Sequence, residues 1–183
     1  MKLIDCFNIF LFEDNLSIEL DILKILNKKD IRLGTSGRKS SQYNVDLKKI
    51  KPFTDSVEKN FIYFKEKLNI QNKHNFVFKN AFVNVNPPYS YNISHMHPNC
   101  FLTGAYYFKA SKDSGNLVLK HPSPCKGLDD YSYKEYNAYN SSLYNISPQE
   151  GKIYIFPNYI DHYVEPNYSK EDRISMSFNI DIV

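Results

Sequence analysis

Residues 173–182 read RISMSFNIDI, an unbroken alternation of polar and apolar side chains. Successive side chains of an extended strand point to opposite faces, so this pattern predicts a long strand with one apolar and one polar face. The apolar face, which carries Met176 and Phe178, is expected to meet the core between two sheets. The polar face, which begins with Arg173 and Ser175, either contacts solvent or lines a polar cavity inside a barrel.

The same kind of pattern extends backwards from this strand to about residue 74. Short apolar or alternating runs are separated by turn residues every ten positions or so, which is typical of a sandwich or barrel. The expected strands are Asn75–Val85, Tyr91–His95, Phe101–Phe108, Asn116–Lys120, Lys152–Phe156, Tyr163–Glu165 and Arg173–Val183. The composition agrees, because 15 Tyr and 13 Phe with only 6 Gly favour pleated sheet surfaces.

The first 70 residues follow a different, mainly helical pattern. A strand is expected over residues 3–12, followed by a helix from Leu16 to Leu26 and a polar loop from Thr35 to Asn44. A second helix is expected from Thr54 or Asp55 to about Leu68. We therefore expect one domain over residues 1–183, with an N-terminal strand and helical layer (1–73) and a β core (74–183).

Charge and cysteine content exclude several classes of protein. The net charge of +3 comes from dispersed residues rather than a basic block, so attraction to nucleic acid or a membrane is not indicated. The 3 cysteines show no CxxC spacing, which fits a reducing compartment. The run 3–12 is interrupted by Asp5 and Asn8 and is predicted to be neither a signal peptide nor a membrane span.

Three histidines form a candidate metal site. His95 and His97 flank Met96, and in an extended segment both side chains would lie on one face. A third histidine, His162, lies in FPNYIDHYVEP, and neutral imidazoles are good ligands for iron, zinc, copper or nickel. The alternative is two surface histidines beside a turn and one unrelated histidine.

Arg173 is a candidate carboxylate-binding residue. It is one of only three arginines, and Ser175, two residues further on, points the same way along the strand. A guanidinium binds a carboxylate through two parallel hydrogen bonds, and a neighbouring hydroxyl adds another donor. The alternative is an arginine at the start of a strand that forms a surface ion pair.

The order of three motifs resembles a known family. HMHPNCFLTGAYYFK, SGNLVLKHPSP and SPQEGKIYIFPNYIDHYVEPNYSKEDRISMSFNI together resemble the iron(II)- and 2-oxoglutarate-dependent oxygenases, over roughly residues 75–183. Within this family, the motifs most resemble those of a small oxygenase group of bacteria and phages that is distantly similar to prolyl hydroxylases. The resemblance implies a mainly β, cupin-like jelly roll, the double-stranded β-helix, with N-terminal helices.

The resemblance also implies roles for single residues. His95 and His162 match metal ligands, Arg173 and Ser175 match the residues that hold 2-oxoglutarate, and Tyr107 matches a tyrosine that contacts the same cosubstrate. The implied cofactors are Fe(II) and 2-oxoglutarate, with ascorbate as a candidate reductant. No further catalytic side chain is expected beyond the metal ligands.

One position departs from the pattern of the wider superfamily. His97 stands where an Asp or Glu ligand is usual, so the metal either has three histidine ligands or takes a carboxylate ligand from elsewhere in the chain. Asp161 and Glu165 lie near His162 in sequence, but in an extended strand both point away from the face that His162 uses.

These features predict a cytoplasmic dioxygenase of bacterial or phage origin that hydroxylates a small-molecule or peptidyl substrate and releases succinate and CO2. One alternative is a three-histidine, cupin-like dioxygenase that does not use 2-oxoglutarate. Another is a non-catalytic jelly-roll binding protein. The sequence does not reveal the substrate or the oligomeric state.

Overall fold

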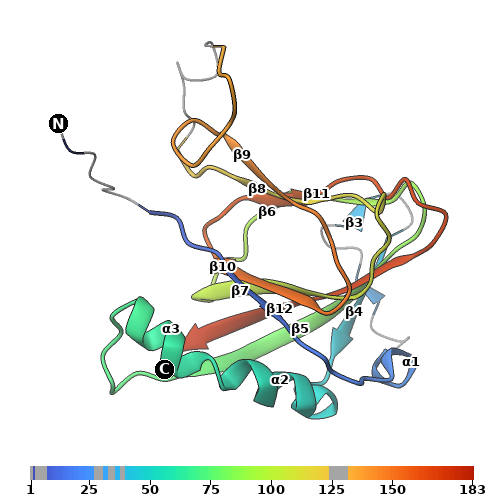
Figure 1. The fold of residues 1–183 in the computed structure, drawn as a ribbon. Coiled ribbons are helices and arrows are strands. Elements are labelled where there is room, and N and C mark those ends of the chain that lie inside the picture. Colours follow the sequence, from blue (N-terminus) through green and yellow to red (C-terminus); the bar gives the residue numbers. More distant parts are fainter. Residues whose placement is uncertain (1, 3–7, 27–30, 33–35, 38–39, 124–131) are drawn as a thin grey trace.

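The computed structural model describes all residues except 1, 3–7, 27–30, 33–35, 38–39 and 124–131. In the part described, two antiparallel sheets face each other, and helices cover the outer face of the larger sheet (Figure 1). This is the mainly β jelly roll with N-terminal helices that the sequence predicts.

The larger sheet contains seven strands among the described residues. In spatial order they are β1 (Phe12–Asn15), β10 (Lys152–Pro157), β7 (Leu102–Lys109), β12 (Arg173–Ile182), β5 (Phe76–Asn86), β4 (Ser41–Val45) and β2 (Ile31–Arg32). The alternating strand β12 lies in the centre, between β7 and β5. Its apolar face, with Met176 and Phe178 fully buried, joins the core under the helices. Its polar face points toward the smaller sheet and lines a cavity there.

The smaller sheet contains five strands in the same described part of the chain. They are β3 (Ser36–Gly37), β6 (Tyr91–His95), β11 (His162–Val164), β8 (Leu117–Lys120) and β9 (Leu143–Ile146). β6 and β11 are neighbours, with His95 opposite His162. A register shift along this pair lets both Asn92 and His95 line the space between the sheets.

The helices form a layer on the larger sheet. They are α1 (Ile22–Ile25), the 3-10 helix η1 (Leu47–Ile50), α2 (Lys51–Glu58) and α3 (Phe61–Lys67). Phe53, Val57, Phe61 and Phe64 recur at helical spacing and pack into the core beside Phe178. Each fully buried large apolar side chain contributes about 1.5–3 kcal/mol to folding, so this stripe is a substantial part of the core.

Close packing fixes the centre of the larger sheet. Gly104 on β7 is opposite both Phe178 and Ile155 in register. A Cβ atom at this position would overlap the Phe178 ring and the carbonyl oxygen of Tyr154. Glycine is therefore required at the point where β7 packs against the Phe178 ring.

The N-terminal part differs from the sequence prediction in several places. The polar segment expected to be a loop contains β3 and β4, and the expected strand over 3–12 is β1 at Phe12–Asn15, with residues 3–7 outside the described part. The helix expected from Leu16 begins only at Ile22, because Asp21 caps its N-terminus. The helix expected up to Leu68 is two helices, α2 and α3, with a turn at residues 59–60.

Candidate metal and cosubstrate site

A cavity of about 250 Å³, lined by both polar and apolar side chains, lies between the two sheets. Its walls bring together residues that are far apart in the sequence. Its lining is Gln42, Phe82, Asn84, Asn92, His95, Met96, His97, Pro98, Thr103, Gly104, Ala105, Tyr107, Leu117, Phe156, His162, Val164, Arg173, Ser175, Ser177 and Asn179. All six residues singled out in the sequence as metal or cosubstrate contacts are in this set.

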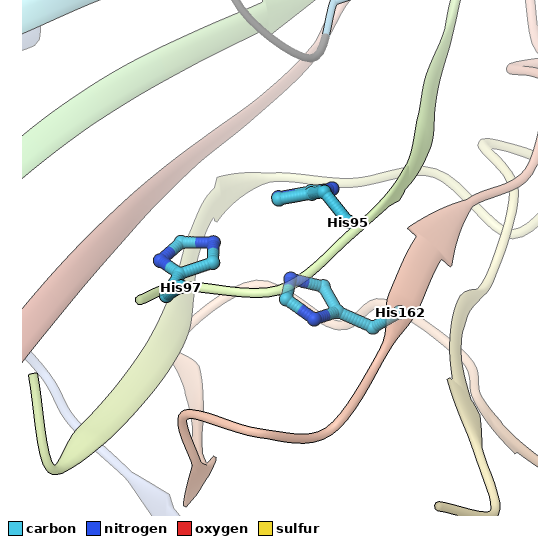
Figure 2. A group of neighbouring side chains, drawn as sticks. All are labelled: His95, His97 and His162. Atoms are coloured by element: carbon cyan, nitrogen blue, oxygen red, sulfur yellow. The ribbon is translucent and has the colours of Figure 1, made fainter. Parts of the chain in front are cut away.

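The three histidines form one cluster, with one side-chain nitrogen from each ring within 4.8 Å of the others. Figure 2 shows His95 and His97 coming from one segment of chain and His162 from another, with the three rings around a common space. His95 ends β6, and His97 lies two residues beyond that end. Ring centroids are 4.4 Å apart for His95 and His162, and 5.0 and 5.1 Å for the pairs that include His97.

Each Nδ1 atom of the cluster already has a hydrogen-bond partner. His95 Nδ1 lies 2.8 Å from the carbonyl oxygen of Ile93, and His162 Nδ1 lies 2.9 Å from that of Ile160. Because a carbonyl oxygen can only accept, these Nδ1 atoms carry the proton. His97 Nδ1 lies 2.7 Å from Asn179 Oδ1. The nitrogen left free on each ring for a metal is therefore Nε2.

The surroundings favour the neutral form of all three rings. Burial lowers the pKa of His162 to about 3, and burial also lowers the pKa of His95 and of His97. At neutral pH the cluster is three uncharged imidazoles, which is the form that binds metal ions. This donor set fits a divalent transition metal.

Arg173 lies at the other end of the cavity and is 1% exposed. Its Nη1 atom donates to the carbonyl oxygens of Ser114 and Gly115, the latter at 3.1 Å. Its Nη2 atom is buried and has no hydrogen-bond partner among the residues that the structure describes. An unpaired, buried guanidinium nitrogen is costly unless an anion binds it, so this end of the cavity fits a carboxylate group.

Two further predicted contacts lie beside the arginine. Ser175 and Tyr107 are opposite each other in register on β12 and β7, and both line the cavity. Burial raises the pKa of Tyr107 to about 12, so its hydroxyl keeps its proton and can donate to a carboxylate. Arg173, Ser175 and Tyr107 thus form a group of donors at one end of the cavity.

The two acidic residues near His162 do not point toward the cluster. Asp161 accepts hydrogen bonds from Ser94 Oγ at 2.7 Å and Lys120 Nζ at 3.0 Å. Glu165 accepts from the backbone of Asn116 at 3.1 Å. Among the residues that the structure describes, no acid lines the cavity.

Cys100, three residues beyond His97, is buried, and burial raises the pKa of its thiol to about 11. Its Sγ donates to the carbonyl oxygen of His97 at 3.2 Å. In this environment Cys100 is a small buried side chain and not a nucleophile.

Sequence reasoning missed part of the cavity wall. Gln42 falls in the segment expected to be a loop, and Asn84 lies in the expected strand Asn75–Val85, where no pattern assigned it to a cavity. Asn179 was placed on the polar face of the last strand, but nothing in the sequence indicated that it contacts His97. The alternation along β12 could have indicated that Asn179 lines the cavity, because it places Asn179 on the same face as Arg173.

A jelly roll that joins three neutral histidines and a buried arginine in one cavity defines a class of metal-dependent proteins that bind an acidic cosubstrate. The model of the family described as "Putative 2OG-Fe(II) oxygenase" matches residues 80–179, more than half of the chain, and the chain belongs to this family. It is an oxidoreductase that uses Fe(II) and 2-oxoglutarate.

Solved structures share the fold at low sequence identity. An oxidoreductase of the 2OG-Fe(II) oxygenase family from Burkholderia pseudomallei is 12% identical, with a TM-score of 0.61 over 87% of this chain and 76% of that chain. A prolyl-4-hydroxylase from Pseudomonas putida is 13% identical, with a TM-score of 0.59 over 92% and 91%. A viral collagen prolyl hydroxylase from Paramecium Bursaria Chlorella virus-1 is 18% identical, with a TM-score of 0.56 over 93% and 94%.

A search of the curated proteins found no match. Among the described residues, every helix is too short or too polar to span a membrane.

Proposed function

We propose that this oxygenase is a dioxygenase that hydroxylates a C–H bond of a small-molecule or peptidyl substrate. His95, His97 and His162 hold Fe(II), while Arg173, Ser175 and Tyr107 hold the distal carboxylate of 2-oxoglutarate. When bound, iron and 2-oxoglutarate supply the activation of dioxygen, with conversion of 2-oxoglutarate to succinate and CO2.

The observation that carries this proposal is the unpaired Nη2 atom of Arg173. A three-histidine dioxygenase without 2-oxoglutarate would leave this buried cation without an anion. A non-catalytic barrel would have no need for three neutral imidazoles in the same cavity. A dicarboxylate that spans from the histidines to the arginine accounts for both features.

The residues of the chain perform three tasks in this reaction. The Nε2 atoms of the three histidines would hold the metal, whose chemistry is the activation of dioxygen. The guanidinium of Arg173 and the hydroxyls of Ser175 and Tyr107 fix the cosubstrate by hydrogen bonds. Apolar side chains in the wall, among them Leu117 and Phe156, exclude water from the reacting groups.

Turnover tests the reaction directly. Purified protein with Fe(II), ascorbate and dioxygen is expected to convert 2-oxoglutarate slowly to succinate, even without substrate, as measured by mass spectrometry. Absence of succinate, with both metal and 2-oxoglutarate shown to be bound, would favour the inert jelly roll. If succinate is formed, a substrate screen that looks for the gain of one oxygen atom would identify the substrate.

Substitution at position 97 tests the ligand set. His97→Ala is expected to lose much of the bound metal, whereas His97→Asp retains it because a carboxylate is also a ligand for iron. His121→Ala is the matched control, since His121 contacts Ser123 and does not line the cavity. Equal metal content in His97→Ala and wild type would remove His97 from the ligand set and leave the oxygenase assignment intact.

A cytoplasmic location is part of the same proposal, because it supplies 2-oxoglutarate and keeps Fe(II) reduced. Cell fractionation followed by immunodetection would test it.

A further inference from the structure

His97 differs from the other two histidines in what holds its ring. Backbone carbonyls accept from His95 and His162, but two side chains contact His97 Nδ1, Asn179 Oδ1 at 2.7 Å and Thr103 Oγ1 at 3.0 Å. Asn179 in turn donates from Nδ2 to Asn80 Oδ1 at 2.7 Å. A chain of hydrogen bonds therefore runs from β5 through β12 to the loop that carries His97.

The donors and acceptors in this chain determine which nitrogen of His97 carries the proton. Thr103 uses its single hydroxyl proton on the carbonyl oxygen of Phe178, at 3.2 Å, so its oxygen can only accept from His97. Asn80 accepts from the Nδ2 side of Asn179, which turns the Asn179 oxygen toward His97. With two acceptors facing it, Nδ1 is protonated and Nε2 has the free lone pair.

We propose that Asn179 and Asn80 are positioning residues that hold His97 in its Nδ1–H tautomer through an uncharged acceptor. This inference rests on the proposed function, because it takes Nε2 of His97 as a metal ligand. The residue that orients a metal-bound histidine affects metal binding without touching the metal.

The uncharged nature of Asn179 has its own consequence. Three neutral imidazoles leave the full charge of a divalent ion in the cavity, and the lining residues in the described part of the chain add only the positive charge of Arg173. An aspartate at position 179 would orient the ring equally well but would place a negative charge beside it. The asparagine thus preserves the positive charge that attracts a dianionic cosubstrate.

The tautomer can be measured without any metal. In apo protein labelled with ¹⁵N-histidine, two-bond ¹H–¹⁵N correlations at pH 7.5 are expected to show His97 protonated at Nδ1 and bare at Nε2. The double variant Asn179→Leu/Thr103→Val removes both acceptors and is expected to shift His97 toward the Nε2–H form. A wild-type His97 protonated at Nε2 would overturn the proposal.

Metal affinity provides a second measurement, by competition for Zn(II) with a chromophoric chelator. Asn179→Leu is expected to bind Zn(II) about 10–100-fold more weakly than wild type. Asn179→Asp is expected to restore Zn(II) affinity to within about threefold of wild type, yet to weaken 2-oxoglutarate binding to the Co(II) form about tenfold. If Leu and Asp weaken Zn(II) binding equally, Asn179 only fills space and the proposal is wrong.

Asn80→Leu tests the next step of the chain, because Asn80 acts only through Asn179. It is expected to weaken Zn(II) binding in the same direction as Asn179→Leu but by a smaller factor, and an unchanged affinity would overturn the role of Asn80. The matched control is Asn86→Leu, which removes a similar buried amide from the same strand, outside the cavity lining and bonded to Ser40 and Asn92 instead. Its Zn(II) affinity and His97 tautomer are expected to equal those of wild type.

The two proposals can fail separately. If His97→Ala keeps the metal, the ligand set is wrong, but the tautomer measured in apo protein still decides whether the asparagines orient the ring.

Discussion

His95 and His162 lie directly opposite each other on the antiparallel strands β6 and β11, with ring centroids 4.4 Å apart. Each ring is held by a carbonyl oxygen two residues earlier in the chain, that of Ile93 or Ile160. Strand pairing and these two hydrogen bonds together fix two of the three histidines. In the proposed site, the pairing of β6 with β11 is therefore a determinant of metal affinity.

Asp161 reinforces this pairing on the outer face of the smaller sheet, where it joins Ser94 and Lys120. Burial acts to raise the pKa of Asp161, but the hydrogen bonds from Ser94 and Lys120 more than offset this and lower it overall. Since both ionic partners are 38% exposed, solvent screening limits the loss of stability in Asp161→Asn to about 1 kcal/mol or less.

We expect Asp161→Asn also to weaken Zn(II) binding a few-fold, because β6 and β11 are less firmly held together. Chelator competition measures the affinity and urea denaturation the stability. Asp55→Asn is the control, since it breaks a similar ion pair, with Lys51, on the surface of α2. Weaker Zn(II) binding in both variants would show that the effect is not specific to the strand pair.

Arg173→Met is expected to keep the fold and the metal while losing most affinity for 2-oxoglutarate. Removal of one partner of a buried charged pair costs roughly 3–5 kcal/mol, a factor of a hundred or more in affinity. Calorimetric titration of the Co(II) form with 2-oxoglutarate measures the change. Lys109→Met, which breaks the exposed ion pair with Glu171, is the control, and an unchanged affinity in Arg173→Met would move the carboxylate site elsewhere.

Gly115 is expected to be essential for the orientation of Arg173. Its φ of +86° suits glycine, its carbonyl oxygen accepts from Arg173, and a Cβ atom would collide with the carbonyl oxygen of Glu165. Gly115→Ala should therefore lose both stability, by about 1–3 kcal/mol, and 2-oxoglutarate affinity.

Gly151→Ala separates these two effects. Gly151 also has positive φ, at +78°, but a Cβ atom there approaches only the Leu16 oxygen, at 3.3 Å. We expect lower stability with nearly normal 2-oxoglutarate affinity, measured by the same denaturation and calorimetry. Loss of affinity in both variants would indicate general loosening of the fold.

The apo protein is expected to lose stability in acid because of its neutral histidines. The pKa of His162 is about 3 in the folded protein and 6.5 in an ordinary histidine, so between these values the unfolded state binds more protons. The free energy of unfolding should therefore fall as pH decreases below 6.5, by up to about 1.4 kcal/mol per pH unit for each such histidine.

Urea denaturation between pH 7.5 and pH 4 measures this slope. His162→Gln should reduce it. A slope that is the same in wild type and in His162→Gln would contradict a neutral, buried His162.

The sequence predicted the cavity well where one strand carried a long, regular pattern. β12 is regular because one face meets the core and the other a polar cavity, and this alternation placed Arg173 and Ser175 correctly. The spacing of His95 and His97 also indicated that both rings lie in one cluster, which the structure shows. His97 lies two residues beyond the end of β6, and its contacts with Asn179 and Thr103 left no signal in the sequence.

The N-terminal part was harder to predict because its polar side chains face a polar cavity instead of solvent. Gln42 lies on β4, where it donates to Asn84, yet a run of polar residues reads as a loop. Pairings that join distant segments, such as Asn179 with Asn80, leave no local pattern either. Such hydrogen bonds depend only on how the distant segments come together in the folded protein.

Met96, between two of the proposed metal ligands, is 55% exposed and lines the cavity, in contrast to the buried thiol of Cys100. An oxygenase that consumes dioxygen without its substrate can oxidise its own sulfur atoms. The sulfur of a thioether carries no proton, so, unlike that of a protonated thiol, it is always in its reactive form. Burial raises the pKa of the Cys100 thiol to about 11, so the thiol keeps its proton at neutral pH. During turnover without substrate, oxidation of the protein should therefore appear first as methionine sulfoxide at position 96, and Cys100 should be oxidised later.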